Sequence, residues 1–307
     1  NAREGLIRLL RELQSAKAKD EDGRAVGPAP SFFALLLADG DRLGKLVGSL
    51  GGERVGRALA TFTCKVPEIV KLHDGVTVYA GGDDVLAMLP VSRALACASA
   101  LSDRYEKAFD DHEPVATLSA AVVFAHVRLP LGVVISEAHR LLDDVAKDAN
   151  GRNSLAVGVL KRGGMHCEWV TTWRRRAPGG GSTRATKLLD DIVERLNEGA
   201  AEPGLSSGLL YRIRETLSLL CGWPQWVPGA WGALPPELDF RAFLHAEVHR
   251  SLADRSEANG IDADELTDLL VSLLEPSRSL ADSGSSSIAE AGIDALLLAR
   301  FLSTPTH

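Results

Sequence analysis

The chain has 307 residues, of which 45% are hydrophobic and 24% charged, a composition typical of folded globular domains rather than of disordered chains. Its formal net charge of −7 argues against a protein that coats nucleic acids, because such a protein needs a net basic face. No apolar run approaches the roughly 20 residues that cross a bilayer, so we expect no membrane association.

The positions of the cysteines argue against a zinc site. The four of them are scattered along the chain, at Cys64, Cys97, Cys167 and Cys221. Zinc sites usually draw on closely paired cysteines and histidines, so we expect no zinc. The scatter fits a protein of the reducing cytoplasm.

The first half of the chain predicts alternating strands and helices. A helix and a charged link are expected within residues 1–30, and residues 31–38 form an apolar run typical of a strand buried on both faces. Two helical segments follow, broken near Pro67, and the run 75–90 predicts a β-hairpin with GGDD at its tip. The later elements are a helix, a strand, an amphipathic helix and two strands, expected at 91–109, 116–125, 131–149, 153–160 and 165–170.

This order, β-α-β-β-α-β-α-β, indicates an α+β fold. Its first six elements match the ferredoxin-like βαββαβ arrangement, in which the first strand and the hairpin lie side by side at the centre of the sheet. We therefore assign one domain to residues 31–176. We expect Asp39, at the end of the first strand, to converge with Asp83 and Asp84 at the hairpin tip.

Residues 177–307 predict a second, small all-α domain. The segment PGGGST after Ala177 has the composition of a flexible link. Helices are expected at 184–198, 205–221, 238–253, 262–275 and 286–302. Between them, WPQWVPGAWGALPP holds three of the five tryptophans, and we interpret it as a packed corner rather than a ligand platform. The triplet Arg174–Arg176 is either a local basic groove or, as we favour, a solvated edge leading into a loop.

The three aspartates predict a site for a divalent cation. Mg²⁺ prefers carboxylate and phosphate oxygens, and paired metal ions position and neutralise phosphates in phosphoryl and nucleotidyl transfer. Gly81 and Gly82 permit a tight hairpin and let a nucleotide approach the backbone closely. The alternative is that Gly-Gly and Asp serve only the turn, but a second Asp-ended strand beside the tip favours the metal site.

Three other partial motifs in the sequence lack the residue spacing that their binding sites require. Asp39-Gly40-Asp41 could open a calcium loop, but Leu43 stands where the next ligand is required. The glycine-rich run 179–187 lacks the order of a P-loop. His245 and His249 lie four residues apart, but no glutamate follows the first histidine, as zinc proteases require.

Four segments, taken in order, resemble the catalytic palm in the large subunit of type III CRISPR effector complexes. They are ADGDRLGKL, YAGGDDVLAMLP, AHVRLPLGVVISEAHRLL with LDDVAKDANGRNSLAVGVLKRGG, and CEWVTTW. The segments AHVRLPLGVVISEAHRLL and CEWVTTW narrow the resemblance to the type III-B (Cmr) branch. The likeness covers residues 31–173 well and extends more weakly through the helical half. The helix–strand segment that closes this palm is also similar, more loosely, to that of GGDEF-type diguanylate cyclases.

The resemblance implies a reaction. Such palms convert ATP, with Mg²⁺ or Mn²⁺, into cyclic oligoadenylates for antiviral defence when the assembled complex captures target RNA. It also implies partners, namely other Cmr-type subunits, the guide crRNA and the target RNA.

The resemblance implies site residues as well. Asp39 and Asp83 would hold metal, and Asp84 would assist them or activate the attacking hydroxyl. Residues expected to border the nucleotide or reach its triphosphate are Gly40, Gly81, Gly82, Lys147, Arg152 and Lys161. Each of these basic residues has an alternative role as a helix-end charge that complements the helix dipole.

Two alternatives stay open. One is a GTP-using cyclase of the GGDEF type, although this hairpin tip has Asp84 followed by Val85 where such enzymes have Glu-Phe. The other is a non-catalytic scaffold subunit that only binds nucleotide. Family members usually also carry an HD nuclease and a first palm. Neither is visible in this sequence, so DNA cleavage is not predicted for it. Because Asn1 is not an initiator, we expect the sequence to lie within a longer polypeptide. A lone palm would lack half of the site for a pair of ATP molecules, so we expect it to need the rest of that chain for activity.

Overall fold

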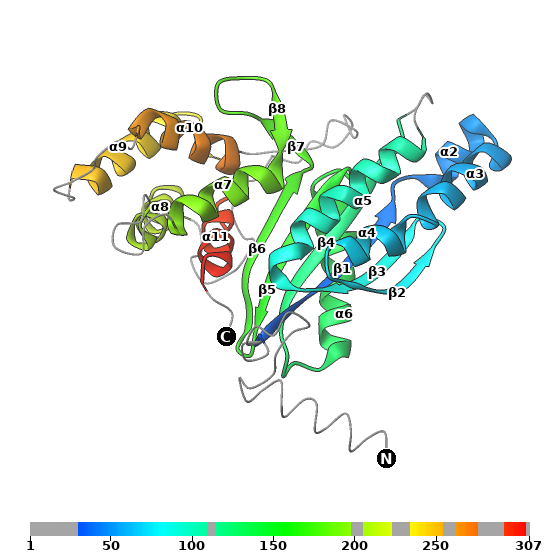
Figure 1. Cartoon of the computed structure of the whole chain (residues 1–307). Helices are drawn as coiled ribbons and strands as arrows, with labels where there is room; N and C mark the ends of the chain where they lie inside the picture. Colours follow the sequence, from blue (N-terminus) through cyan, green and yellow to red (C-terminus); the bar gives the residue numbers. More distant parts are fainter. Residues whose placement is uncertain are drawn as a thin grey trace, which may run out of the picture.

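The computed structural model describes residues 30–109, 115–197, 205–222, 234–253, 262–275 and 292–304. A six-stranded sheet in the order β2-β3-β1-β4-β5-β6 forms the centre of the molecule (Figure 1). All neighbouring strands are antiparallel except β4 and β5, which run parallel. The strands are β1 (Phe32–Gly40), β2 (Val76–Gly81), β3 (Asp84–Leu89), β4 (Leu118–His126), β5 (Ser154–Lys161) and β6 (Gly164–Thr172).

The first four strands confirm the predicted ferredoxin-like arrangement. β1 lies between β3 and β4, and β2 follows β3 at the edge. The strands at the centre are apolar on both faces, as in β4, where every residue from Leu118 to Ala125 is buried. One boundary differs from the prediction: β1 continues through Asp39 and Gly40, because both residues still pair with β4.

Helices cover both faces of this sheet. One face packs against α3 (Gly52–Thr63), α4 (Val66–Leu72) and α5 (Ala94–Ala108), with α2 (Leu43–Leu50) and the short turn η1 (Val91–Arg93) beside them. The other face packs against α6 (Leu131–Arg140) and its continuation η2 (Leu141–Ala149). The sequence predicts one uniform helix over 131–149, but its second half is a π-helix, a rare form that is frequent at functional sites.

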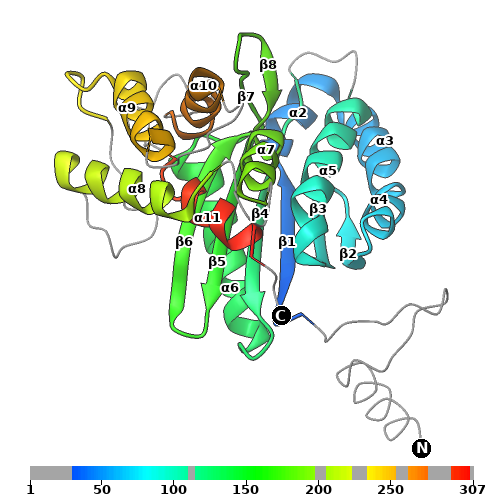
Figure 2. The same ribbon diagram turned by 60° about the vertical axis from the view of Figure 1, so that its left-hand side comes forward.

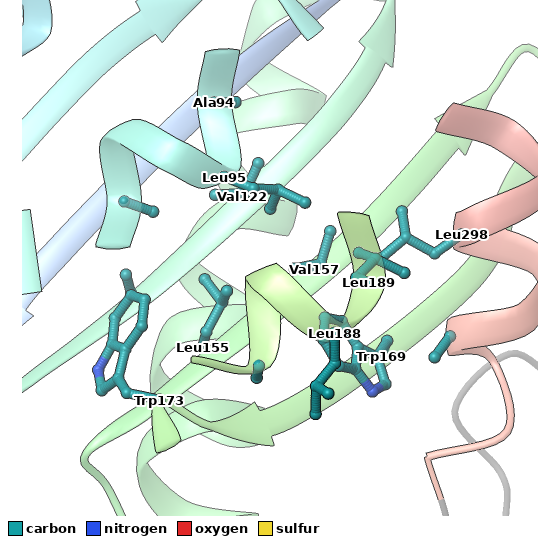
Figure 3. Packing of buried hydrophobic residues seen from close by; sticks show 14 of the residues in the cluster. Ala94, Leu95, Val122, Leu155, Val157, Trp169, Trp173, Leu188, Leu189 and Leu298 are labelled. Atoms are coloured by element: carbon teal, nitrogen blue, oxygen red, sulfur yellow. The ribbon is translucent and has the colours of Figure 1, made fainter. Parts of the chain in front are cut away.

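The helical half shares a core with the sheet. Leu188 and Leu189 of α7 (Ala185–Asn197) lie close to Val157 and Trp169 of the sheet and to Leu298 of α11 (Ala295–Leu302) (Figure 3). The other helices of this half are α8 (Ser207–Cys221), α9 (Phe240–Ala253) and α10 (Ala263–Leu274), which lie beside the β6 edge (Figure 2). The boundary at residues 176/177 stays a prediction, and the hydrophobic core is continuous across it.

The segment predicted as a flexible link is instead the turn of a second hairpin. β7 (Arg174–Arg176) pairs antiparallel with β8 (Ser182–Arg184), and three consecutive glycines with positive φ, Gly179–Gly181, make the turn. Glycine tolerates these φ angles without steric cost, so the same composition serves an ordered turn as well as a loose link.

The favoured interpretation of the arginine triplet is wrong for its central member. Arg175 is buried, and its guanidinium donates to the carbonyls of Ser272, 2.8 Å away, and Glu275, 2.6 Å away, at the end of α10. Arg174 and Arg176 are exposed. Arg175 therefore fastens α10 to the β7/β8 hairpin, and the triplet does not form a continuous basic groove.

Some predictions fall outside the described residues. These are the helix at 2–18, the first part of the tryptophan loop at 223–233 and the start of the last predicted helix at 286–291. Within the part of the chain that is described, no helix has both the length and the apolar character needed to span a membrane.

Candidate functional site

The pairing of β1, β2 and β3 brings the three aspartates together. Ala38 pairs with Val85, and both point into the core on the α5 side, so the adjacent Asp39 and Asp84 point to the opposite face. Asp83 lies in the turn between β2 and β3. Carboxylate oxygens of Asp39, Asp83 and Asp84 lie within 4.8 Å of one another. The predicted convergence is therefore confirmed.

Burial and the neighbouring carboxylates change the acidity of Asp83 and Asp84. Burial raises the pKa of Asp84 to about 6, aided by a side-chain hydrogen bond with Asp39 and by the charges of Asp39 and Asp83. Burial also raises the pKa of Asp83, with a smaller contribution from the charge of Asp39. The cluster therefore accumulates negative charge that a cation can neutralise, and its oxygen atoms are the donors that Mg²⁺ and Mn²⁺ prefer. These residues fit a divalent cation.

Lys147 is the basic residue that the structure places in this cluster. Its Nζ lies 2.5 Å from Asp39 Oδ2 and 3.1 Å from Asp143 Oδ1, and its side chain is 15% exposed. Burial works to lower the pKa of Lys147, but the hydrogen bonds and charges of Asp39 and Asp143 raise it overall. Lys147 is therefore a firmly charged ammonium beside the carboxylates, carried by the π-helical segment η2.

The glycines have different surroundings. Gly40 is buried, and a Cβ at this position would overlap Tyr105 Oη and lie 2.8 Å from Asp83 Cβ. Gly82 is exposed with φ +65°, and its carbonyl accepts a hydrogen bond of 2.8 Å from Thr63 Oγ1 at the end of α3. Gly81 lies next to the Tyr79 hydroxyl. Gly81 and Gly82 thus line the tip as predicted, whereas Gly40 lets Tyr105 and the tip pack directly against β1.

Asp41 is a residue of the site region that the sequence did not identify. It is 5% exposed and accepts hydrogen bonds from Thr117 Oγ1 (2.8 Å), Ser119 Oγ (2.8 Å) and the backbone N–H of Asn153 (2.9 Å). These bonds tie the end of β1 to the start of β4 and to the loop after η2. Asp41 therefore positions the site, and its only signal in the sequence is a second aspartate just beyond the strand.

Arg152 and Lys161, both predicted to contact triphosphate, lie in different places. Arg152 belongs to the loop tied to Asp41, at the acidic end of the sheet, and its guanidinium lies 3.7 Å from Asp148. Lys161 lies at the opposite end, because Leu160 pairs with Ala125, which in turn pairs with Phe33. Phe33 precedes Asp39 by six residues, roughly 20 Å along a strand. The structure does not bring Lys161 to the acidic cluster.

A family model matches this part of the chain. Residues 32–156, which include all three aspartates and Lys147, match the model described as the second palm domain of Cas10/Cmr2. Over these residues the chain is similar to the palm of the Cas10/Cmr2 family. This confirms the resemblance and the fold class that the sequence predicts.

Relatives of known name agree with this assignment. The chain is 30% identical over 199 residues to the CRISPR system Cmr subunit Cmr2 of Pyrococcus furiosus, a match that covers 55% of this chain and 23% of the relative. It is 27% identical over 161 residues to the Cmr2 subunit of Saccharolobus solfataricus, which covers 46% and 15% of the two chains. The chain thus spans about a quarter or less of the length of the curated relatives it matches.

A solved structure shows the same fold. The cryo-EM structure of the type III-B Cmr-beta complex bound to cognate target RNA contains a chain with a TM-score of 0.56 and 14% identity. The match covers 91% of this chain and 39% of that chain. Because the match covers 91% of this chain, it extends beyond the palm into the helical half, so that half belongs to the shared fold.

Proposed function

We propose that this Cas10/Cmr2 palm converts ATP into cyclic oligoadenylates, with Mg²⁺ or Mn²⁺, as part of a type III-B effector complex in the cytoplasm. The observation that carries the proposal is the convergence of carboxylate oxygens of Asp39, Asp83 and Asp84 within 4.8 Å of one another, where β1 ends beside the β2/β3 hairpin tip. Nucleotidyl transfer needs chiefly correct positioning and neutralisation of phosphate charge, which a metal held by such carboxylates supplies.

Each residue of the cluster has a part in this reaction. Asp39 and Asp83 would hold the cation, and Asp84 would either complete its coordination or accept a proton. In the reaction, a ribose 3′-hydroxyl oxygen attacks the α-phosphorus of a second ATP, the bond to pyrophosphate breaks, and the hydroxyl proton passes to a base. Asp84 suits that base, because a carboxylate with a pKa of about 6 accepts a proton better than an ordinary one.

Basic residues at the same end would bind the triphosphate. Lys147 is within reach, since it already pairs with Asp39, and Arg152 is carried by the neighbouring loop. Gly81 and Gly82 would leave room for the nucleotide beside the hairpin tip. We do not extend this role to Lys161, because the strand register places it at the far end of β5.

The partners belong to the proposal too. The structural relative is part of a complex with other subunits and target RNA, and we propose the same setting for this chain, with guide crRNA included. The surface of the helical half is proposed to contact sibling subunits. This chain spans a quarter or less of the length of its curated relatives. We propose that the rest of the site, which must hold two ATP molecules, comes from outside this sequence.

Product analysis tests the function. The assembled complex, containing the full-length subunit, is incubated with ATP, Mg²⁺ and matching target RNA, and the products are identified by mass spectrometry. Cyclic oligoadenylates are expected from the wild type and should be absent from Asp83→Asn/Asp84→Asn. Lys161→Met is the matched control, expected to leave the products unchanged.

Two results would favour the alternatives. Product from GTP in place of ATP would identify a GTP-using cyclase. No cyclic product from either nucleotide, with nucleotide binding retained, would identify a scaffold subunit and contradict the proposal.

A further inference from the structure

Tyr105 is a buried aromatic residue directly beneath the acidic cluster. It ends the apolar stripe of α5, after Ala94, Ala98 and Leu101, and its side chain is fully buried. Its ring packs between Phe62, at 5.0 Å and nearly perpendicular, and Phe109, at 5.1 Å. For packing alone, a phenylalanine at this position would serve as well.

The hydroxyl of Tyr105 has no hydrogen-bond partner among the described residues. An unpaired buried hydroxyl costs free energy, because it has lost its water without gaining a partner. Such a group calls for an explanation, and a catalytic role or a bound ion is among the common ones. The position of the hydroxyl therefore identifies which group could become its partner.

That group is Asp83. A Cβ on Gly40 would overlap the Tyr105 hydroxyl and lie 2.8 Å from Asp83 Cβ. The hydroxyl and Asp83 therefore lie on either side of the same small space. The other carboxylates whose charges act on Tyr105 are engaged: Asp41 accepts from Thr117, Ser119 and Asn153, and Asp39 pairs with Lys147. Burial and the charges of Asp83, Asp41 and Asp39 raise the pKa of Tyr105, so its hydroxyl stays protonated and can only donate to a carboxylate.

We propose that Tyr105 is a positioning residue whose hydroxyl donates to the Asp83 carboxylate when a divalent cation binds the cluster. The inference rests on the metal site of the proposed function. A carboxylate that ligates a metal with one oxygen has its second oxygen free for a hydrogen bond, and such outer partners orient the ligand. Gly40 is part of the same arrangement, because any side chain there would separate Tyr105 from Asp83.

The test is Tyr105→Phe in the full-length protein, with Mn²⁺ as the probe. Mn²⁺ affinity is measured by electron paramagnetic resonance, and sites elsewhere are subtracted with Asp83→Asn/Asp84→Asn. We expect the affinity of the cluster to fall about 10- to 100-fold, as for other outer-shell partners of metal ligands. Metal-free thermal stability should be unchanged or higher, because the lost hydroxyl has no partner in that state.

Two controls separate positioning from packing. Tyr79→Phe removes another hydroxyl beside the tip, that of an exposed tyrosine, and should leave Mn²⁺ affinity unchanged. Phe62→Leu disturbs the ring contact of Tyr105 without touching its hydroxyl, and should lower stability more than metal affinity. An unchanged Mn²⁺ affinity in Tyr105→Phe, or a lower metal-free stability, overturns the inference.

The result also separates this inference from the proposed function. If the wild type binds Mn²⁺ at the cluster and forms no cyclic product, a weaker affinity in Tyr105→Phe still supports the role of Tyr105. If product forms normally and Tyr105→Phe binds Mn²⁺ like the wild type, the role of Tyr105 is wrong while the proposed function stands.

Discussion

Lys147 Nζ lies 2.5 Å from Asp39 Oδ2, so the acidic cluster already contains one cation of the protein's own. An ammonium in this place balances the negative charge of the aspartates and competes with a metal for Asp39. In the proposed function, the same ammonium would turn to the triphosphate when ATP binds with its metal. Lys147 would then have opposite effects on metal binding and on ATP binding, which can be measured separately.

Lys147→Met should leave Mn²⁺ binding at pH 8 at least as tight as in the wild type, because the competing charge is gone. ATP binding should weaken about 10- to 100-fold, the loss expected of a charge-assisted hydrogen bond worth about 1.5–3 kcal/mol. Both affinities are measured by calorimetry on the full-length protein, with Lys161→Met as the control at the far end of β5. Weaker Mn²⁺ binding, or unchanged ATP binding, would contradict this role.

The raised pKa of Asp84 predicts a pH dependence of stability in the metal-free protein. Its folded-state pKa is about 6, against roughly 3.9 for an ordinary aspartate. Between these values the folded state holds more protons than the unfolded state, so the free energy of unfolding falls as pH rises from about 4 to 6 and then levels off.

Comparing the wild type with Asp84→Asn isolates this effect. Relative to the variant, the wild type should lose thermal stability between pH 4 and pH 7, as followed by calorimetry without divalent metal. Added Mn²⁺ should reverse the trend, since it binds the deprotonated carboxylates. A stability difference that does not vary with pH would show that Asp84 is not perturbed.

The sequence predicted the acidic site because topology alone decides its geometry. Once the order βαββαβ is recognised, Asp39 and the hairpin tip must be neighbours, whatever the side chains around them. The sequence placed Lys161 wrongly because it lies only nine residues after Arg152. β5 starts at the acidic end of the sheet and runs away from it, so each further residue of the strand lies farther from the aspartates. The motif alone did not show in which direction this strand runs.

Other features depend on packing that the sequence does not reveal. In the sequence, Tyr105 resembles any core residue at the end of an alanine-rich helix. In the structure, it differs from such residues because its buried hydroxyl has no hydrogen-bond partner among the described residues. In the sequence, Arg175 cannot be distinguished from a surface charge, because its partners are backbone carbonyls 97 and 100 residues away. The hairpin β7/β8 escaped detection because three glycines suit a link and a turn equally.

Arg175 provides a prediction about the helical half. Arg175→Met should lower the free energy of unfolding by about 2–4 kcal/mol, because two carbonyls at the end of α10 lose their charged donor. Arg174→Met and Arg176→Met, at exposed neighbouring positions, should change it by no more than about 0.5 kcal/mol. Urea denaturation measures all three. Equal effects would restore the interpretation of the triplet as a solvated edge.

Gly40 and Gly82 should differ sharply when each is replaced by alanine. In Gly40→Ala the new Cβ would meet Tyr105 and lie 2.8 Å from Asp83 Cβ, so we expect a loss of about 1–3 kcal/mol and weaker Mn²⁺ binding. In Gly82→Ala the space is open, and only the φ of +65° costs about 1–2 kcal/mol, with Mn²⁺ binding retained. Urea denaturation and Mn²⁺ titration distinguish them, and a neutral Gly40→Ala would contradict the packing described here.

The most direct test is to locate the metal. Crystals of the full-length protein soaked with Mn²⁺ and ATP are examined by anomalous X-ray scattering. The account predicts a Mn²⁺ peak about 2.1 Å from carboxylate oxygens of Asp39 and Asp83, with Asp84 at its side. Saturated crystals with no peak among these three residues would contradict it.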